Sequence, residues 1–329
     1  MSNGISKNLL ETPGKLTGKM SNESGYIMKC YKSFLRSRYL LLIFLPGFLF
    51  YIIFKYFPMY GVIIAFKDFD IYDGFLKSPW TSHSGFGHFV KLFTNPEFYK
   101  LLRNTLVISL YGLIFGFPAP IILALSLNEV RNSLWKRTVQ TISYLPHFIS
   151  VVVICGMVVN FVSLNGAVNQ LLKVFGMEPI QFLAHPQYFR TIYIASGIWQ
   201  GMGWGSIIYL AALAGIDTQL YESAVIDGAN RWKQLIHITI PGIMPAIIIT
   251  LILRIGDIMD VGFQKIILLY NPMIYETADV ISSFVYRRGI LDADFSYSTA
   301  VNLFESIIGL ILIYSANKIA SKVSETSLW

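Results

Sequence analysis

Three ionisable residues follow one another at steps of three near the end of an apolar run: Arg254, Asp257 and Asp260. On an α-helix this spacing keeps side chains near one face, so Arg254 and Asp257 could form an i, i+3 ion pair. Ionisable groups in an apolar run usually face a cavity or a partner, where they bind protons or polar solutes. Two interpretations therefore stay open, a structural ion pair and a solute pathway, and Glu305 in the last apolar run presents the same choice.

Aromatic and amide side chains of the kind that bind sugars form a second group. Sugar rings have apolar C–H faces that stack on aromatic rings, and hydroxyl rims that hydrogen-bond to amides and carboxylates. The candidate pathway residues are Asn160, Gln200, Trp204, Tyr209, Asp257 and Asp260. Trp199 has the simpler interpretation of an aromatic residue at a membrane–water interface. The residue types predict a polar solute and do not identify it.

The sequence has no arrangement typical of an enzyme or a metal site. Its five histidines are scattered, and it has no H-E-x-x-H, Cys–His or G-x-S-x-G pattern. Cys30 and Cys155 fit neither a disulfide pair nor a metal site. The nearest approach to a phosphate-binding loop, residues 14–20, is one residue short and has Met20 in place of Ser or Thr. We therefore expect no catalytic residue, cofactor or metal ion in this chain.

Composition predicts that these residues belong to a multi-span membrane protein. Of the 329 residues, 54% are hydrophobic and 14% are charged, against about 25% charged in an average globular chain. A membrane-spanning helix needs ~20 mostly apolar residues. The predicted spans are about 39–60, 104–128, 141–162, 191–213, 241–262 and 296–317. The fold class is therefore an all-α membrane protein with six transmembrane helices, and the short run 266–275, which contains Pro272, is expected to be a loop or a short outer segment.

The charge distribution predicts the orientation of the chain. Residues 1–38 hold seven Lys and Arg, but only Glu11 and Glu23 as acids. Positive charge is retained on the cytoplasmic side of a membrane, so we expect residues 1–38 to be a cytoplasmic basic tail, partly disordered, and six spans then place both termini in the cytoplasm. Because the basic residues adjoin an apolar run, a nucleic-acid partner is not expected.

Residues 218–245 differ from the short polar turn that is expected between two spans. Asp217 and Thr218 are residue types that cap a helix, and Gly228 weakens or ends that helix. Pro241 lies where the next membrane helix is expected to begin. An apolar face follows at helical spacing, formed by Val225, Ile226, Ala229, Trp232, Leu235 and Ile236. Such a segment either docks into a cytoplasmic partner or lies on lipid headgroups, and the apolar face alone does not separate the two.

The same segment resembles the EAA loop of ABC importer permeases, which reads E-A-A, three residues, G, nine residues and I-x-L-P. The matching positions are Glu222, Ser223, Ala224, Asp227, Gly228, Ala229, Ile238 and Pro241. Ser223 replaces an alanine of the pattern, and Ile240 replaces its leucine. From about Tyr39 to Trp329 the chain is similar to permeases that import polysaccharide, alginate or aldouronate, notably over residues 57–69, 101–125, 143–150 and 203–217.

The resemblance implies a type I ABC importer permease fold over residues 39–329, with a coupling loop at 218–240, in a bacterial plasma membrane. It implies four kinds of partner: a second permease subunit, usually a different protein; two ATPase subunits, which bind ATP and Mg; an extracellular solute-binding lipoprotein; and an oligosaccharide substrate. The coupling loop would dock into an ATPase subunit.

Two observations bear on substrate and mechanism. Asp257 and Asp260 weigh against a polyanionic sugar such as alginate, because like charges repel. A secondary transporter driven by an ion gradient is the alternative function, but it predicts inverted repeats, and no segment occurs in a second copy. A membrane enzyme is disfavoured by the missing catalytic patterns.

Overall fold

The computed structural model describes residues 38–323, and within this range the regular elements are helices joined by turns and loops, with one isolated β-bridge between Lys67 and Trp80. The predicted basic tail, apart from Arg38, lies outside the described residues, as do residues 324–329. The internal contacts divide the chain into residues 1–62 and residues 63–329, which are described separately.

In residues 1–62, α2 (Arg38–Tyr51) is followed by the π-helical turn η1 (Ile52–Tyr56) and by η2 (Phe57–Phe66), which continues past the division as a 3₁₀-helix. Phenylalanines four residues apart contact each other along this helix, with ring centroids 5.7 Å apart for Phe44 and Phe48. Such i, i+4 pairs favour the helical conformation.

Residues 63–329 contain the remaining elements. They are α3 (Gly74–Lys77), η3 (His83–Gly85), α4 (Gly87–Thr94), α5 (Pro96–Tyr111), η4 (Gly112–Gly116), α6 (Pro118–Glu129), α7 (Ser133–Tyr144), η5 (Leu145–Phe148), α8 (Val151–Val162), α9 (Ala167–Val174), η6 (Phe182–Ala184), α10 (Pro186–Ala214), α11 (Thr218–Ile226), α12 (Arg231–Gln234), η7 (Leu235–Thr239), α13 (Ile240–Gly256), α14 (Phe263–Leu269), η8 (Pro272–Ile274), α15 (Tyr275–Ala278), α16 (Ile281–Tyr286), η9 (Arg287–Leu291) and α17 (Phe295–Val323).

Five helices of the described range are long and apolar enough to cross a membrane. They are Tyr39–Phe66, Pro96–Glu129, Val151–Val174, Arg231–Gly256 and Phe295–Lys322. The fourth predicted span corresponds to α10, which has 29 residues but is not among the five. Its glycines, serines and glutamine lower its hydropathy, so six spans remain a prediction.

A π-helical turn precedes a proline in three of the long helices. The turns are Ile52–Tyr56 before Pro58, Gly112–Gly116 before Pro118 and Leu235–Thr239 before Pro241. In each, the residue just before the proline donates its N–H to the carbonyl five residues earlier. Proline has no N–H and its ring clashes with the carbonyl four residues earlier, and the wider turn lets the helix continue. Pro241 therefore lies in the first turn of α13, as expected, but the helical stretch extends back from there through η7 to Arg231.

Three predicted segments differ from the structure. The third predicted span is interrupted, because α7 ends just before Leu145–Pro146 and α8 starts anew after Ser150, whose hydroxyl accepts from the Val153 N–H. The fifth helix ends at Gly256 rather than at 262. After it, the short helix α14 overlaps the run that was expected to be a loop or a short outer segment, and its Ile266 and Leu269 are buried in the protein interior.

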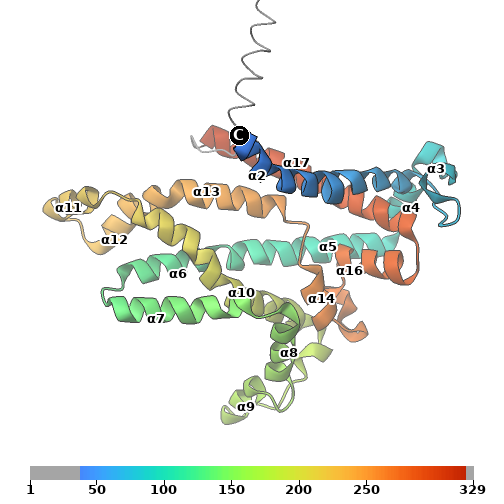
Figure 1. Cartoon of the computed structure of the whole chain (residues 1–329). Coiled ribbons are helices and arrows are strands. Elements are labelled where there is room, and N and C mark those ends of the chain that lie inside the picture. Colours follow the sequence, from blue (N-terminus) through green and yellow to red (C-terminus); the bar gives the residue numbers. More distant parts are fainter. Residues whose placement is uncertain (1–37, 324–329) are drawn as a thin grey trace, which may run out of the picture. The chain divides into compact units, whose positions relative to one another are not determined.

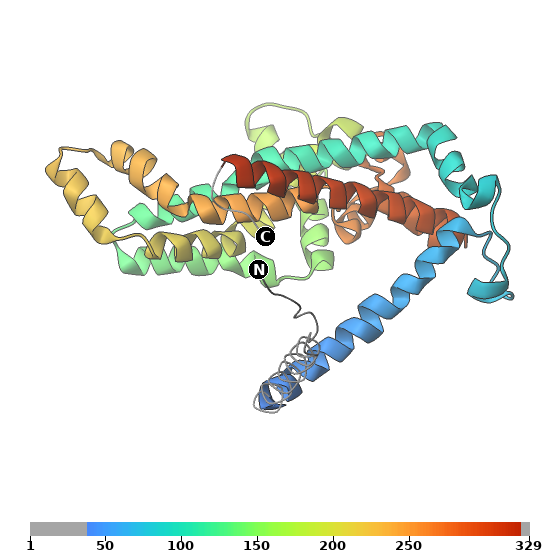
Figure 2. The same ribbon diagram turned by 90° about the horizontal axis from the view of Figure 1, so that it is seen from above.

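Within residues 63–329, α10 packs along α6, and α13 packs along α17. In Figure 1 the turn between α6 and α7 lies with α11 and α12 at one end, while α4 and α16 lie at the other. Figure 2 shows α13 (orange) beside α17 (red), running in opposite directions. A buried cluster that includes Ile108, Ile154, Phe189 and Ile266 joins α5, α8, α10 and α14. The long helices therefore position two regions, the α11–α12 end and the space between α5, α10 and α13.

Candidate functional site

The helix that contains Glu222, Ser223 and Ala224 has well-defined ends. At its start, the Asp217 carboxylate accepts the N–H of Gln219 at 2.9 Å, as predicted for a capping residue. At its end, the Ala229 N–H donates to the Ala224 carbonyl at 2.8 Å. Gly228 has φ +74°, a left-handed conformation that glycine adopts without strain. Gly228 therefore ends α11, as the sequence predicts, and Asp227 and Ala229 flank this turn.

A second helix follows at once. The Asn230 side chain accepts the Lys233 N–H at 2.9 Å and caps α12. From Arg231 the helix continues through η7, which contains Ile238, and through Pro241 into α13. The hydroxyls of Tyr221 and Thr239, 3.0 Å apart, connect the two helices. We call residues 217–241 the coupling segment.

The coupling segment also contacts the turn after α6. A nitrogen of the Arg231 guanidinium lies 2.5 Å from a carboxylate oxygen of Glu129. Both side chains are exposed, so this ion pair contributes little to the free energy of unfolding. Its geometry nevertheless places two chain reversals, about 100 residues apart, side by side (Figure 1).

The coupling segment presents apolar side chains outward. Ile226 is 86% exposed, Trp232 71% and Val225 62%. Glu222, Ser223 and Asp227 are also exposed, whereas Ala224 is half-buried. Groups of exposed apolar side chains on one element mark surfaces that bind another protein or a membrane.

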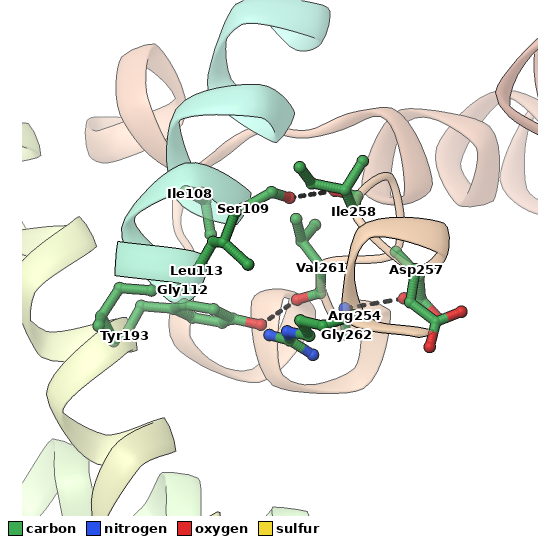
Figure 3. Close-up of a pocket in the computed structure, with 12 residues that line it drawn as sticks. Ile108, Ser109, Gly112, Leu113, Tyr193, Arg254, Asp257, Ile258, Val261 and Gly262 are labelled. Carbon is green, nitrogen blue, oxygen red and sulfur yellow. Dashed lines mark hydrogen bonds between the residues drawn. The ribbon is translucent and has the colours of Figure 1, made fainter. Parts of the chain in front are cut away.

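The candidate pathway residues divide between two cavities that share Arg254. The first, which we call the aspartate cavity, has a volume of about 310 Å³ and is lined by Asp257 (Figure 3) and by Asp260. The second, the glutamine cavity, has a volume of about 460 Å³ and is lined by Gln200 and Tyr209. The structure thus brings four of the six predicted residues to adjoining spaces between α5, α10 and the end of α13.

The aspartates follow α13 and are not on it. Asp257 is the first residue after the helix, and Asp260 accepts the N–H of Gly262 at 2.9 Å. Among the described residues Arg254 has no carboxylate within 4 Å, so the Arg254–Asp257 ion pair, one of the two interpretations of the spacing, is absent from this range. The spacing argument failed because the helix ends at Gly256, before the second and third residues of the series.

Two hydroxyls hold this turn in place. Tyr193 donates to the carbonyl of Val261, and Ser109 donates to the carbonyl of Ile258 (Figure 3). The turn 257–262 is therefore attached to both α10 and α5. Glu305 lies near the same turn, since with Asp257 and Asp260 it lines a third cavity of about 540 Å³.

The other two candidates lie elsewhere. The indole of Trp204 stacks on the imidazole of His147, with ring centroids 4.6 Å apart and planes 2° from parallel. Asn160 is exposed near the end of α8 and lines neither cavity. Tyr209, by contrast, is 3% exposed, and its hydroxyl lies 2.8 Å from that of Thr250 on α13.

Sequence reasoning missed Lys265. This residue is 8% exposed, lines the glutamine cavity, and donates from Nζ to the Tyr193 carbonyl at 2.9 Å. Its Nζ also lies 4.7 Å from the centroid of the Tyr193 ring. A signal was present, since Lys265 is the one charged residue in the run 263–270.

An ion pair between Arg287 and the buried Asp279 stabilises the segment 275–291. The Arg287 guanidinium contacts both carboxylate oxygens of Asp279, at 2.7 and 2.6 Å. Burial alone lowers the pKa of Arg287, but the hydrogen bonds and charge of Asp279 raise it above its ordinary value. Asn104 donates to the carbonyls of Glu276 and Asp279, at 2.9 Å each. Segment 275–291 is thereby fastened to α5.

Comparison with known proteins gives a consistent result. Residues 116–320 match the family described as binding-protein-dependent transport system inner membrane component. The chain is 45% identical to Protein LplB of Bacillus subtilis (strain 168), over 89% of this chain and 92% of that protein. It is also 45% identical to the polygalacturonan/rhamnogalacturonan transport system permease protein YteP of the same organism, over 90% of this chain and 91% of the relative.

A solved structure matches over a similar extent. It is a chain of a bacterial alginate ABC transporter in complex with an alginate pentasaccharide-bound periplasmic protein. That chain is 43% identical to this one, the TM-score is 0.83, and the match covers 91% of this chain and 99% of the other. Family, relatives and structure all agree with the resemblance that the coupling segment indicated.

Proposed function

This chain belongs to the family of binding-protein-dependent transport system inner membrane components, and on that premise we propose that it forms half of the translocation pore of an ATP-driven importer. The substrates are oligosaccharides or polysaccharide fragments, and the chain itself is a transport subunit of the inner membrane. Its relatives do not support a transporter driven by an ion gradient. ATP and Mg are bound by a separate ATPase subunit.

The observation that carries this proposal is the coupling segment. It is a helix–turn–helix in which each helix begins at a capping side chain, Asp217 or Asn230. The Tyr221–Thr239 hydrogen bond joins the two helices, and apolar side chains face outward. A helix that lies on lipid would not need a hydrogen bond between the two helices. A segment that docks into a rigid groove benefits from such a preorganised shape. We propose that Ile226 and Trp232 enter a groove on the ATPase subunit.

The proposed topology has six spans, with α10 as the fourth, and cytoplasmic termini. The coupling segment and the turn after α6 lie at one end of residues 63–329, which agrees with a shared cytoplasmic side (Figure 1). A periplasmic binding protein accompanies the matching alginate transporter, and we propose an equivalent partner, a solute-binding lipoprotein, for this chain. The other partners are two ATPase subunits and a second permease subunit.

The test is to purify the tagged chain from its native membrane in mild detergent and to measure bound subunits and ATP hydrolysis. We expect an ATPase subunit to co-purify, and a sugar-loaded binding protein to stimulate hydrolysis. Ile226→Glu and Trp232→Glu should each abolish co-purification without affecting membrane insertion. The matched control is Leu76→Glu, since Leu76 is 77% exposed in α3, outside the five candidate spans. A chain that purifies alone, or a control that behaves like the two variants, would refute the proposal.

A further inference from the structure

An apolar cavity of about 320 Å³ lies between α8 and α10, and we call it the α8–α10 cavity. Val168 of α9 and Phe182 of η6 complete its lining. Among the described residues that line it, none has a charged group or an amide, and the only hydroxyls are those of Thr191 and Ser196. The Ser196 hydroxyl already donates to the Ile192 carbonyl at 2.6 Å. The cavity therefore does not suit a sugar, whose hydroxyls need hydrogen-bonding partners.

The shape of the α8–α10 cavity is fixed by the packing around it. Val158 and Ile192 in its wall also belong to the buried cluster that joins α5, α8, α10 and α14. The Asn169 side chain, which is fully buried, donates to the carbonyls of Ser163 and Ile180 and accepts the Ile180 N–H, each at 2.8 Å. These bonds fix α9 at the end of α8, and with it the neighbouring Val168. The cavity is therefore preformed.

The α8–α10 cavity opens on the surface of a membrane helix. Two of its lining side chains lie partly outside, since Phe161 is 50% exposed and Trp199 is 40% exposed. Phe161 belongs to the helix Val151–Val174, which is long and apolar enough to cross a membrane. The opening is therefore continuous with the surface that this inner-membrane component presents to lipid.

The helix beside the opening, α9, has the character of a helix that lies at a membrane surface. Val174 is 80% exposed, Leu171 62%, and Phe175, which follows the helix, 76%. Lys173 is exposed and has no carboxylate oxygen within 4 Å among the described residues. Apolar side chains beside a lysine fit the boundary between headgroups and acyl chains, where the ammonium group meets lipid phosphates. Since Val168 of the same helix lines the cavity, the cavity lies at the depth of the acyl chains.

We infer that the α8–α10 cavity binds one acyl chain of a phospholipid whose phosphate lies near Lys173. Lipid tails are as apolar as the lining, so packing decides what occupies such a cleft in a membrane. An empty cleft would lose the dispersion contacts of its lining atoms. A flexible acyl chain follows an irregular wall and needs no hydrogen bond, and Lys173 favours a lipid phosphate over an apolar helix of another subunit. This lipid site goes beyond the proposed function, because it is separate from the solute pathway.

The experiment uses the whole chain in its native membrane, fused with vesicles of a phosphatidylglycerol that carries a diazirine in one acyl chain. The membrane is illuminated either before or after purification in mild detergent, and peptide mass spectrometry locates the labelled residues. Before purification, we expect label on the cavity lining, at Phe161 and Trp199, and on exposed lipid-facing positions such as Phe44 of α2, which is 63% exposed. After purification, the lining should keep its label and Phe44 should lose it, because detergent replaces loosely held lipid.

Two variants of α10 locate the site. Ala195 lines the cavity and is exposed, so Ala195→Phe places a ring in the cavity without disturbing buried packing. It should remove the label that persists on Phe161 after purification. The matched control is Ala211→Phe, since Ala211 is exposed on the same helix and lies outside this cavity. This control should keep the label.

Three results would overturn the inference. Loss of label from the lining as readily as from Phe44 would mean that only bulk lipid touches the cavity. A lining that stays unlabelled before purification, while Phe44 is labelled, would mean that another subunit covers it. Equal labelling of the Ala195→Phe and Ala211→Phe proteins would place the bound chain elsewhere. None of these readouts involves the ATPase subunit, so the inference and the proposed function are tested separately.

Discussion

Gly228 offers a direct test of the coupling segment. A Cβ atom at this position would meet no atom within 4 Å, so alanine introduces no clash. The penalty is the backbone conformation, φ +74°, which costs a residue with a side chain about 1–2 kcal/mol. Alanine also loses less conformational entropy on folding than glycine does, by about 0.4–1 kcal/mol. The net cost of Gly228→Ala is therefore about 1 kcal/mol.

Proline at this position costs more. Its φ is fixed near −65°, and it removes the N–H that Gly228 donates to the Val225 carbonyl at 3.0 Å, so we expect about 3 kcal/mol or more. The helix before the turn has only nine residues, and helices this short are marginal without support. Loss of the turn therefore lowers the fraction of the segment that is competent to dock, and the apparent affinity falls with that fraction.

The assay is the binding of the purified ATPase subunit to the permease in nanodiscs. We expect a loss of affinity of up to ~5-fold for Gly228→Ala and more than ~100-fold for Gly228→Pro. Gly176, which follows α9, is the matched control: it also has φ +74° and no atom within 4 Å of an added Cβ. Gly176→Ala carries the same local cost away from the coupling segment. Equal ATPase affinities of the Gly228→Ala and Gly176→Ala proteins would refute the reasoning, as would normal transport by Gly228→Pro.

Two further predictions concern folding. Gly203→Ala should sharply reduce the yield of folded protein, because its Cβ would overlap the backbone carbonyl of Ser143. Gly201→Ala on the same helix meets no atom within 4 Å and should express normally. Equal yields would contradict the close contact between α7 and α10. Arg287→Met should lower the free energy of unfolding by about 3–5 kcal/mol, because it leaves the buried Asp279 carboxylate unpaired. Denaturant unfolding of the purified protein measures this change in the free energy of unfolding. Adding Asp279→Leu to Arg287→Met should restore most of the lost stability. If the double variant shows no recovery, loss of the ion pair is not the cause.

The coupling segment could be predicted from the sequence because its signals are local. Asp217 caps the helix that it precedes, and Gly228 ends it, with no help from distant residues. Three of the four glycines of α10, Gly201, Gly203 and Gly205, show the limit of such reasoning. The sequence alone does not distinguish them, yet an added Cβ would meet Ser143 at Gly203, Pro120 at Gly205 and no atom within 4 Å at Gly201. Which side of a helix meets a neighbour depends on how the helices pack.

The cavities could not be predicted for the same reason. Gln200 and Trp204 are four residues apart on α10, yet Gln200 lines the glutamine cavity and Trp204 stacks on His147. Lys265 enters the cavity because α14 is buried and contacts α8, whereas the sequence around it is only a short apolar run. This run is as short as a loop or a strand. Burial against distant residues, and not local preference, makes it a helix.

One helix connects the coupling segment to the glutamine cavity. It runs without a break from Arg231 to Gly256, ~39 Å at about 1.5 Å per residue, and carries Trp232 in its first turn and Arg254 in its last. A continuous helix transmits a displacement of its first turn, which a loop would absorb. The π turn before Pro241 is its weakest point, because a normal helical hydrogen bond is missing there. Beyond it, the Tyr209–Thr250 hydrogen bond ties α13 to α10. If α13 moves alone relative to α10, this hydrogen bond breaks. If the bond is kept, α10 moves together with α13, and Gln200 on α10 moves as well.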